Sequence, residues 1–213
     1  MKIAIYGAGG FGKEVACLIQ RINDNGGNWE LIGFFDDTKQ PGFQVSLYGT
    51  VLGGMDTLQN IDEPLAVAIA INDNKAVSRI RKEITNPKIS FPNLIDPSTF
   101  LVDERTVIMG EGNIIQNDCM ISCDVTIGSF NLLNDHVVVG HDNCIGSFNG
   151  LMPAARLSGG ITIGDNNLLG AASVVLQGMV IGNGITLGAN SVLMTKPKDG
   201  LTYLGVPARR FGF

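Results

Sequence analysis

Residues 139–164 read VGHDNCIGSFNGLMPAARLSGGITIG, and an apolar residue returns at every sixth position of this stretch. The same spacing extends in both directions over fifteen positions, and all fifteen are apolar although only 45% of the chain is hydrophobic. These positions are Met109, Ile115, Ile121, Ile127, Leu133, Val139, Ile145, Leu151, Leu157, Ile163, Leu169, Val175, Ile181, Leu187 and Leu193. A fixed period over so many residues indicates a structural repeat.

A stripe with a six-residue period cannot stay on one face of an α-helix, because six residues at 3.6 per turn rotate well past a full turn. Short strands joined by tight corners can keep it. The pattern resembles the left-handed parallel β-helix, in which three hexapeptides make one triangular coil of about 18 residues. A glycine follows the apolar residue in eight of the fifteen repeats, and we interpret these glycines as corners with unusual backbone angles. Residues 97–213 are therefore expected to form an all-β domain of stacked coils.

The first part of the chain has a different pattern. Residues 2–6, 31–35 and 65–71 are predicted strands, residues 91–94 are a possible last strand, and residues 13–23 and 75–84 have the apolar spacing of helices. Alternating strands and helices predict an α/β unit with a parallel sheet. We therefore expect a Rossmann-like nucleotide-sugar-binding domain over residues 1–96, followed by the left-handed β-helix with a C-terminal cap.

Charge and hydropathy exclude several classes of function. With 15 Lys+Arg against 20 Asp+Glu the net charge is −5, so the sequence does not have the excess of basic residues that binds nucleic acid or an anionic membrane. Its apolar runs are shorter than the ~18 residues of a membrane span, and glycines break the first of them too early for a signal peptide. A cytoplasmic protein is expected.

The chain has two histidines, His136 and His141, and both lie within the repeats. Imidazole titrates near neutral pH, so a histidine here is a candidate general base, with a solvated or structural role as the alternative. One coil beyond His141 the sequence has Gly159, which would leave bare backbone above the ring. This would give space for a thioester, and a backbone N–H could donate to the carbonyl oxygen of that thioester. His136 falls on a different edge without such a neighbour. We therefore prefer His141.

These motifs occur in an order that resembles the bacterial sugar acyltransferases with hexapeptide repeats. This group includes the sialic acid O-acetyltransferases and the UDP-4-amino-sugar N-acetyltransferases of surface-glycan synthesis. The residues that carry the resemblance are Gly7-Ala8-Gly9-Gly10-Phe11-Gly12-Lys13-Glu14-Val15, Phe34-Phe35-Asp36-Asp37, Val139-Gly140-His141-Asp142-Asn143-Cys144-Ile145-Gly146 and Gly205-Val206-Pro207-Ala208-Arg209-Arg210. The resemblance covers essentially the whole chain.

The resemblance implies a role for individual residues. His141 is the implied catalytic base. Asp142 is the implied carboxylate that holds the other ring nitrogen of His141, and many relatives carry Glu at the position of Asp142. Acetyl-CoA is implied as cosubstrate, with no metal, in a groove between neighbouring β-helices of a homotrimer. The positions that match small residues along this groove are Gly159, Ala171 and Ala189.

The glycine turn at the start of the chain indicates a phosphate site. Gly7, Gly9 and Gly12 fit G-x-G-x-x-G between a predicted strand and a predicted helix, with acidic residues ending the next strand. This motif alone would suggest NAD, but residues 1–96 are too few for two mononucleotide halves. We interpret it as a site for one nucleotide, and the resemblance implies a UDP-sugar; a packing role alone is the alternative. The candidate substrate contacts are Gly9, Gly10, Phe11, Asp36, Asp37, Asn72, Lys75 and Asn134.

The sequence therefore predicts an acetyl-CoA-dependent acetyltransferase that acts on the amino group of a nucleotide-linked sugar. Acetylation of a hydroxyl, as in a sialic acid O-acetyltransferase, is the alternative reaction. A non-catalytic trimeric β-helix that binds a sugar nucleotide or scaffolds partners is the alternative of another class.

Overall fold

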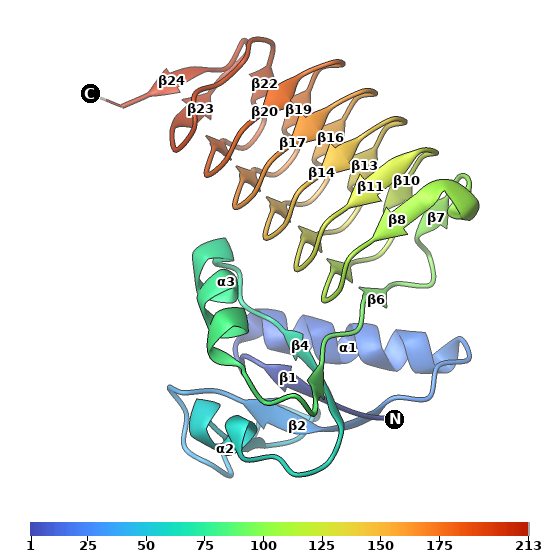
Figure 1. Cartoon of the computed structure of the whole chain (residues 1–213), viewed down its shortest axis with the longest axis vertical. Coiled ribbons are helices and arrows are strands. Elements are labelled where there is room, and N and C mark those ends of the chain that lie inside the picture. Colours follow the sequence, from blue (N-terminus) through green and yellow to red (C-terminus); the bar gives the residue numbers. More distant parts are fainter. Residues whose placement is uncertain (213) are drawn as a thin grey trace. The chain divides into compact units, whose positions relative to one another are not determined.

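A computed structural model describes residues 1–212 and divides the chain into two compact units, Met1–Pro97 and a second unit that begins at Ser98. The first unit is an α/β sandwich of the Rossmann type, and the second is a left-handed β-helix (Figure 1). The fold class predicted from the sequence is thus confirmed.

The first unit contains a parallel five-stranded sheet with the order β3-β2-β1-β4-β5. The elements are β1 (Lys2–Tyr6), α1 (Gly10–Asp24), β2 (Glu30–Phe35), β3 (Val51–Gly53), α2 (Met55–Gln59), β4 (Leu65–Ile69), α3 (Asn74–Glu83), β5 (Ile89–Ser90) and β6 (Leu94–Ile95). Strand β4 is buried throughout, as expected for a strand covered on both faces. The chain leaves β1 toward one side and returns to β4 on the other, which creates a crevice at the carboxyl ends of these strands.

Most of the predicted elements of this unit are confirmed, with ends displaced by a few residues. The strand predicted over residues 91–94 is wrong, because β5 ends at Ser90 and β6 begins at Leu94. Pro92 lies between them and has no N–H to donate to a strand ladder. The short elements β3 and α2 were not predicted, since three and five residues are too few to establish a period.

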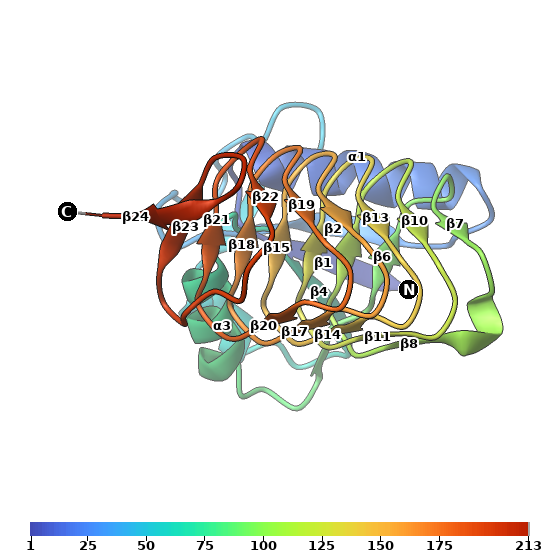
Figure 2. The same cartoon turned by 90° about the horizontal axis from the view of Figure 1, so that it is seen from above.

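The second unit is a stack of triangular coils (Figure 2). Strands one coil apart pair in parallel with a shift of 18 residues, as in Ile121↔Val139 and Val139↔Leu157. Of the fifteen apolar positions, Met109 is half-buried and the other fourteen are buried in the interior. The apolar column therefore forms the core of the prism.

Three sheets form the sides of the prism. The first contains β7 (Phe100–Leu101), β10 (Met120–Ile121), β13 (Val138–Val139), β16 (Arg156–Leu157), β19 (Val174–Val175) and β22 (Val192–Leu193). The second contains β8 (Val107–Met109), β11 (Val125–Ile127), β14 (Cys144–Ile145), β17 (Thr162–Ile163) and β20 (Val180–Ile181). The third contains β9 (Ile114–Ile115), β12 (Leu132–Leu133), β15 (Gly150–Leu151), β18 (Leu168–Leu169), β21 (Thr186–Leu187), β23 (Thr202–Leu204) and β24 (Arg209–Phe211). A 3₁₀ turn, η1 (Glu104–Thr106), precedes β8.

The interpretation of the repeat glycines as corners with unusual backbone angles is wrong. The left-handed backbone angles fall two residues later in each hexapeptide, for example at Asp118 (φ 55°) and Asp142 (φ 56°). The glycines allow close stacking instead: a Cβ on Gly128 would lie 2.6 Å from the carbonyl oxygen of Gly146. At Gly128 the backbone of the next coil thus leaves no room for a side chain.

Buried asparagines line one edge of the prism, which we call the asparagine edge (residues 110–113, 128–131, 146–149, 164–167 and 182–185). Asn113, Asn131, Asn149 and Asn167 are at most 1% exposed. Each of the last three donates from Nδ2 to the side-chain oxygen one coil earlier, over 3.0–3.1 Å. These bonds satisfy polar groups that the tight corners place inside the core.

Candidate active site

His141 lies at the corner that follows β13, on what we call the histidine edge (residues 122–125, 140–143, 158–161 and 176–179). Its Nδ1 is 2.6 Å from Oδ2 of Asp142, and both side chains are about two-thirds exposed, at 64% and 65%. When Nδ1 carries the proton donated to this carboxylate, Nε2 is the basic nitrogen. The pair therefore presents an oriented imidazole to solvent.

The backbone of Gly159 lies directly against this imidazole. A Cβ at position 159 would be 2.5 Å from Nε2 of His141, so the ring fills the space that a side chain would need. Gly160 N–H donates to the carbonyl oxygen of His141 over 2.8 Å, whereas within residues 1–212 no hydrogen bond uses the N–H of Gly159. A polar N–H without a partner thus adjoins the candidate base.

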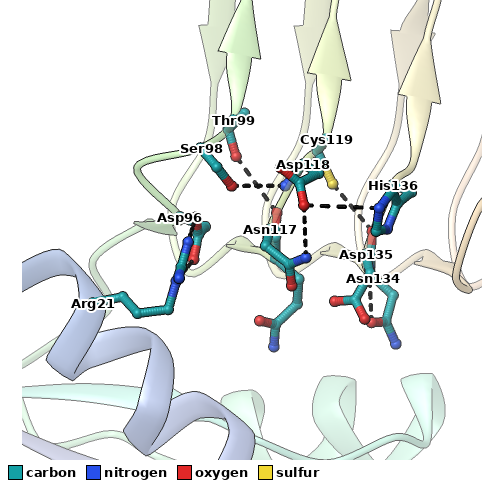
Figure 3. A network of polar contacts seen from close by, with 11 residues as sticks. Arg21, Asp96, Ser98, Thr99, Asn117, Asp118, Cys119, Asn134, Asp135 and His136 are labelled. Atoms are coloured by element: carbon teal, nitrogen blue, oxygen red, sulfur yellow. Dashed lines mark hydrogen bonds and ion pairs between the residues drawn. The ribbon is translucent and has the colours of Figure 1, made fainter.

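His136 belongs to another edge, which we call the Asn134 edge (residues 116–119, 134–137, 152–155, 170–173 and 188–191). Figure 3 shows His136 with Asp118, Asn134 and their neighbours, and His136 Nε2 is 3.7 Å from Asp118 Oδ2. Asn134 accepts a hydrogen bond from the N–H of Asp135 over 2.8 Å. Since β13 separates the two edges, the structure does not bring Asn134 to His141 within one chain.

The three positions predicted to contact coenzyme A fall on two edges. Gly159 is on the histidine edge, whereas Ala171 and Ala189 stack one coil apart on the Asn134 edge. Asn190 N–H donates to the carbonyl oxygen of Ala171 over 2.8 Å, which holds these two coils together. Ala171 is half-buried and Ala189 is exposed, so this part of the edge carries only small side chains.

The first unit has a pocket of about 480 Å³ at the carboxyl ends of its central strands. Six of the predicted substrate contacts line it: Gly9, Gly10, Phe11, Asp36, Asp37 and Asn72. Lys75 is not part of the lining, and Arg79, one helical turn further along α3, is. Tyr6 also lines it and was missed by the sequence reasoning. The helical spacing between residues 75 and 79 is the signal that could have indicated Arg79.

The glycines of the turn divide into two kinds. A Cβ on Gly12 would lie 2.0 Å from the carbonyl oxygen of Gly7, and Gly7 itself has φ +115°, so both are required by packing and backbone geometry. A Cβ on Gly9 or Gly10 would have nothing within 4 Å. Gly9 is the N-cap of α1, and no side chain caps the helix. The amino end of α1 is therefore bare where it lines the pocket, as a phosphate site requires.

Asp36 and Asp37 are held by the chain itself. Asp36 accepts from Ala8 N–H over 2.8 Å and from Thr38, and Asp37 accepts from Met55 N–H over 2.7 Å and from the Tyr6 hydroxyl. Burial opposes ionisation of Asp36, but the hydrogen bonds from Thr38 and Ala8 prevail and lower its pKa. Burial, and then the bond to Asp37, raises the pKa of Tyr6. Both carboxylates shape the pocket and retain lone pairs for a ligand.

Residues 1–212 contain no group of three or more His, Cys, Asp or Glu side chains placed to hold a metal ion. None of the helices there is long and apolar enough to cross a membrane.

Comparisons with known proteins agree with this architecture. Residues 2–86 match the PglD N-terminal domain family, and no curated protein sequence matches the chain. The acetyltransferase domain of PglB from Neisseria gonorrhoeae FA1090, solved also with acetyl coenzyme A, is 27% identical with a TM-score of 0.88. That match covers 99% of this chain and 99% of the free domain.

Two further solved structures match over the whole chain. PerB from Caulobacter crescentus, in complex with CoA and GDP-perosamine, is 27% identical with a TM-score of 0.86, covering 100% of this chain and 98% of PerB. WeeI from Acinetobacter baumannii AYE is 28% identical with a TM-score of 0.84, covering 99% and 100%. The fold and the domain order of this chain are therefore those of the bacterial sugar acyltransferases with hexapeptide repeats.

Proposed function

We propose that the chain transfers the acetyl group of acetyl-CoA to the amino group of a nucleotide-linked sugar in surface-glycan synthesis. The His141–Asp142 pair, set against the bare backbone of Gly159, is the observation that carries this proposal. The nucleotide pocket of the first unit supports an activated sugar as acceptor. Because acetyl-CoA and nucleotide sugars are cytoplasmic metabolites, the proposal also places the reaction in the cytoplasm.

The residues of the histidine edge have distinct roles in this reaction. Nε2 of His141 accepts the proton that the attacking nitrogen loses as it bonds to the thioester carbon. Asp142 holds the Nδ1 proton and stabilises the imidazolium that forms. The N–H of Gly159 donates to the carbonyl oxygen as negative charge develops on it. The carbon–sulfur bond then breaks, and the thiolate takes up the proton held by His141.

A direct assay tests the proposal against both alternatives. The purified chain is incubated with acetyl-CoA and a panel of nucleotide-linked amino sugars, free amino sugars and sialic acid, and thiol release and product mass are measured. We expect turnover with a nucleotide-linked amino sugar and a product that resists hydroxylamine, because amides resist it and esters do not. A hydroxylamine-sensitive product would indicate O-acetylation. Failure to bind acetyl-CoA would favour the non-catalytic scaffold.

The bare amino end of α1 gives a prediction for the nucleotide. Gly9→Asp places a carboxylate at the N-cap, where it accepts the helix N–H bonds that a phosphate would otherwise use. We expect the affinity for a nucleoside diphosphate to fall at least tenfold, since one lost charge-assisted bond costs ~1.5–3 kcal/mol. Thermal stability should be kept or raised, because an N-cap side chain stabilises the helix. Titration calorimetry and thermal unfolding measure the two effects.

Gly9→Asn is the matched control for charge, since it caps the helix without adding a carboxylate. It should weaken nucleotide binding less than Gly9→Asp does. Equal affinities of the wild type and Gly9→Asp for UDP, GDP, TDP and CMP would show that the turn serves packing only. Asp36 and Asp37 are poorer test positions, because replacing them also removes bonds to Ala8 and Met55.

The proposed active species is a homotrimer. Exposed apolar side chains lie on and beside the sheet that contains β19 and β22: Leu176 (37% exposed) and Met194 (45%) directly follow these strands, and Phe100 (62%) belongs to β7. Exposed apolar patches of this kind are typical of subunit contacts. A trimer with sites between its prisms would also unite the histidine edge of one copy with the Asn134 edge of the next, which together hold the predicted coenzyme contacts.

Charge placed on this face is expected to dissociate the trimer. Leu176→Asp combined with Met194→Asp should yield monomers by light scattering, because a carboxylate loses its hydration when buried in an interface. Thr162→Asp on the outer face of β17 is the control and should remain trimeric. A wild-type chain that is monomeric and active at assay concentration would contradict the proposed assembly.

A further inference from the structure

Asn143 is buried inside the prism immediately after the His141–Asp142 pair. It is 2% exposed, and its Nδ2 donates to the carbonyl oxygens of Gly140 over 3.0 Å and of Ser158 over 2.9 Å. Its Oδ1 accepts from the N–H of Ile161 over 2.6 Å. All three bonds end on the backbone of the two corners that carry His141 and Gly159. Asn143 therefore joins the candidate base to the candidate oxyanion donor.

This asparagine interrupts an otherwise apolar column. The inner positions one coil before, one coil after and two coils after it are Val125, Ile161 and Met179. On the asparagine edge such residues recur in four successive coils and bond to one another. Since the fold accepts valine, isoleucine or methionine at this place on the histidine edge, stacking of the coils alone does not require an asparagine there.

The bond to Ser158 fixes the direction of the Gly159 N–H. The carbonyl of Ser158 and the N–H of Gly159 belong to one planar trans peptide, so they point in opposite directions. Asn143 binds that carbonyl from the interior of the prism. The N–H of Gly159 must then point away from the interior of the prism, and the ring of His141 lies against the same residue.

We propose that Asn143 is a positioning residue. It directs the Gly159 N–H toward the thioester carbonyl and keeps the Ser158–Gly159 peptide in place relative to the His141 ring. This inference rests on the proposed acetyl transfer. Asn143 touches no substrate; it acts through the Ser158–Gly159 peptide and, by its bond to Gly140, through the peptide that precedes His141. A donor fixed in advance needs no reorganisation as the oxyanion forms.

The test compares Asn143→Val with Asn149→Val in the full-length chain. Asn149 donates to the Gly164 carbonyl over 2.9 Å and accepts from the Asn167 N–H over 2.9 Å, so its loss removes similar bonds on the asparagine edge. Both variants should lose thermal stability. Only Asn143→Val should lower kcat, by roughly ten- to a hundredfold, because a misdirected oxyanion donor costs less than the roughly 10²–10³ of a missing one; KM for acetyl-CoA should be nearly unchanged.

A spectroscopic measurement separates positioning from loss of structure. The infrared carbonyl band of acetyl-CoA labelled with ¹³C at the thioester carbon reports its hydrogen bonding without any acceptor sugar. In the complex with Asn143→Val we expect the band at higher wavenumber than with the wild type and with Asn149→Val. If Asn143→Val fails to fold, Asn143→Ser serves instead. The fold accepts serine at an inner position, as at residues 173 and 191. A serine hydroxyl can donate to only one of the carbonyls of Gly140 and Ser158, so the positioning bonds would still be incomplete.

The outcomes separate the two proposals. If the wild type transfers no acetyl group and binds no acetyl-CoA, the proposed function fails, and the role of Asn143 fails with it. If the wild type is active while Asn143→Val and Asn149→Val share the same kcat and the same carbonyl band, only the inference about Asn143 is overturned.

Discussion

Replacement of His141 by alanine is expected to lower kcat by roughly 10²–10⁴, the usual contribution of a general base. One ring nitrogen is bound to Asp142, and the other lies where a Cβ on Gly159 would be, so the ring is held at the position from which we expect it to accept the proton. Binding of acetyl-CoA should be nearly unchanged, because the predicted coenzyme contacts are backbone and small residues. Steady-state kinetics and calorimetry with acetyl-CoA measure the two quantities.

Two further variants control this prediction. Asp142→Asn should cost less than His141→Ala, since it removes only the group that orients the ring. His136→Ala should cost far less than His141→Ala, because Ala154 rather than a glycine lies one coil beyond His136. A damaging His136→Ala together with a nearly silent His141→Ala would contradict the assignment of the base.

The second unit could be predicted from the sequence almost completely, because its core repeats along the chain. The six-residue period gave the interior column and the shift of 18 residues between paired strands. The error concerned the glycines. A glycine in a sequence does not reveal whether it provides a left-handed angle or room for a neighbour, and here Asp118 and Asp142 adopt the left-handed angles while Gly128 provides the room.

The sites could be predicted only in part. The pairing of His141 with Gly159 follows from the period, because 18 residues separate them. Arg79 could have been indicated by its helical spacing from residue 75, but Tyr6 lines the nucleotide pocket from a strand with four consecutive buried residues, in which no local pattern marks the residue that faces the pocket. Asn143 is a small polar residue in a column of apolar ones, and its three backbone bonds become visible only when the coils are stacked.

Gly159→Ala is expected to lower kcat by about 10², because displacing a catalytic group by roughly 1 Å has that cost. The added Cβ would lie 2.5 Å from Nε2 of His141, and an exposed ring at the end of a side chain can swing aside at little cost in stability. The backbone itself tolerates a side chain here, because Gly159 is not among the residues with positive φ. The equivalent positions of other coils do carry side chains: Cys123 lies one coil before His141, and Gln177 lies one coil after Gly159. The loss should therefore come from the imidazole alone.

A double-mutant cycle checks this cause. In a His141→Ala background the ring is absent, so adding Gly159→Ala should change the residual kcat by less than about twofold. The same substitution should then raise the free energy of unfolding by about 0.4–1 kcal/mol, because alanine restricts the unfolded chain more than glycine does. Gln177→Ala, one coil further along the same edge, should leave kcat unchanged in either background. If Gly159→Ala is equally harmful with and without His141, its effect comes from the backbone N–H rather than from the ring, and the contact between His141 and Gly159 is not what requires the glycine.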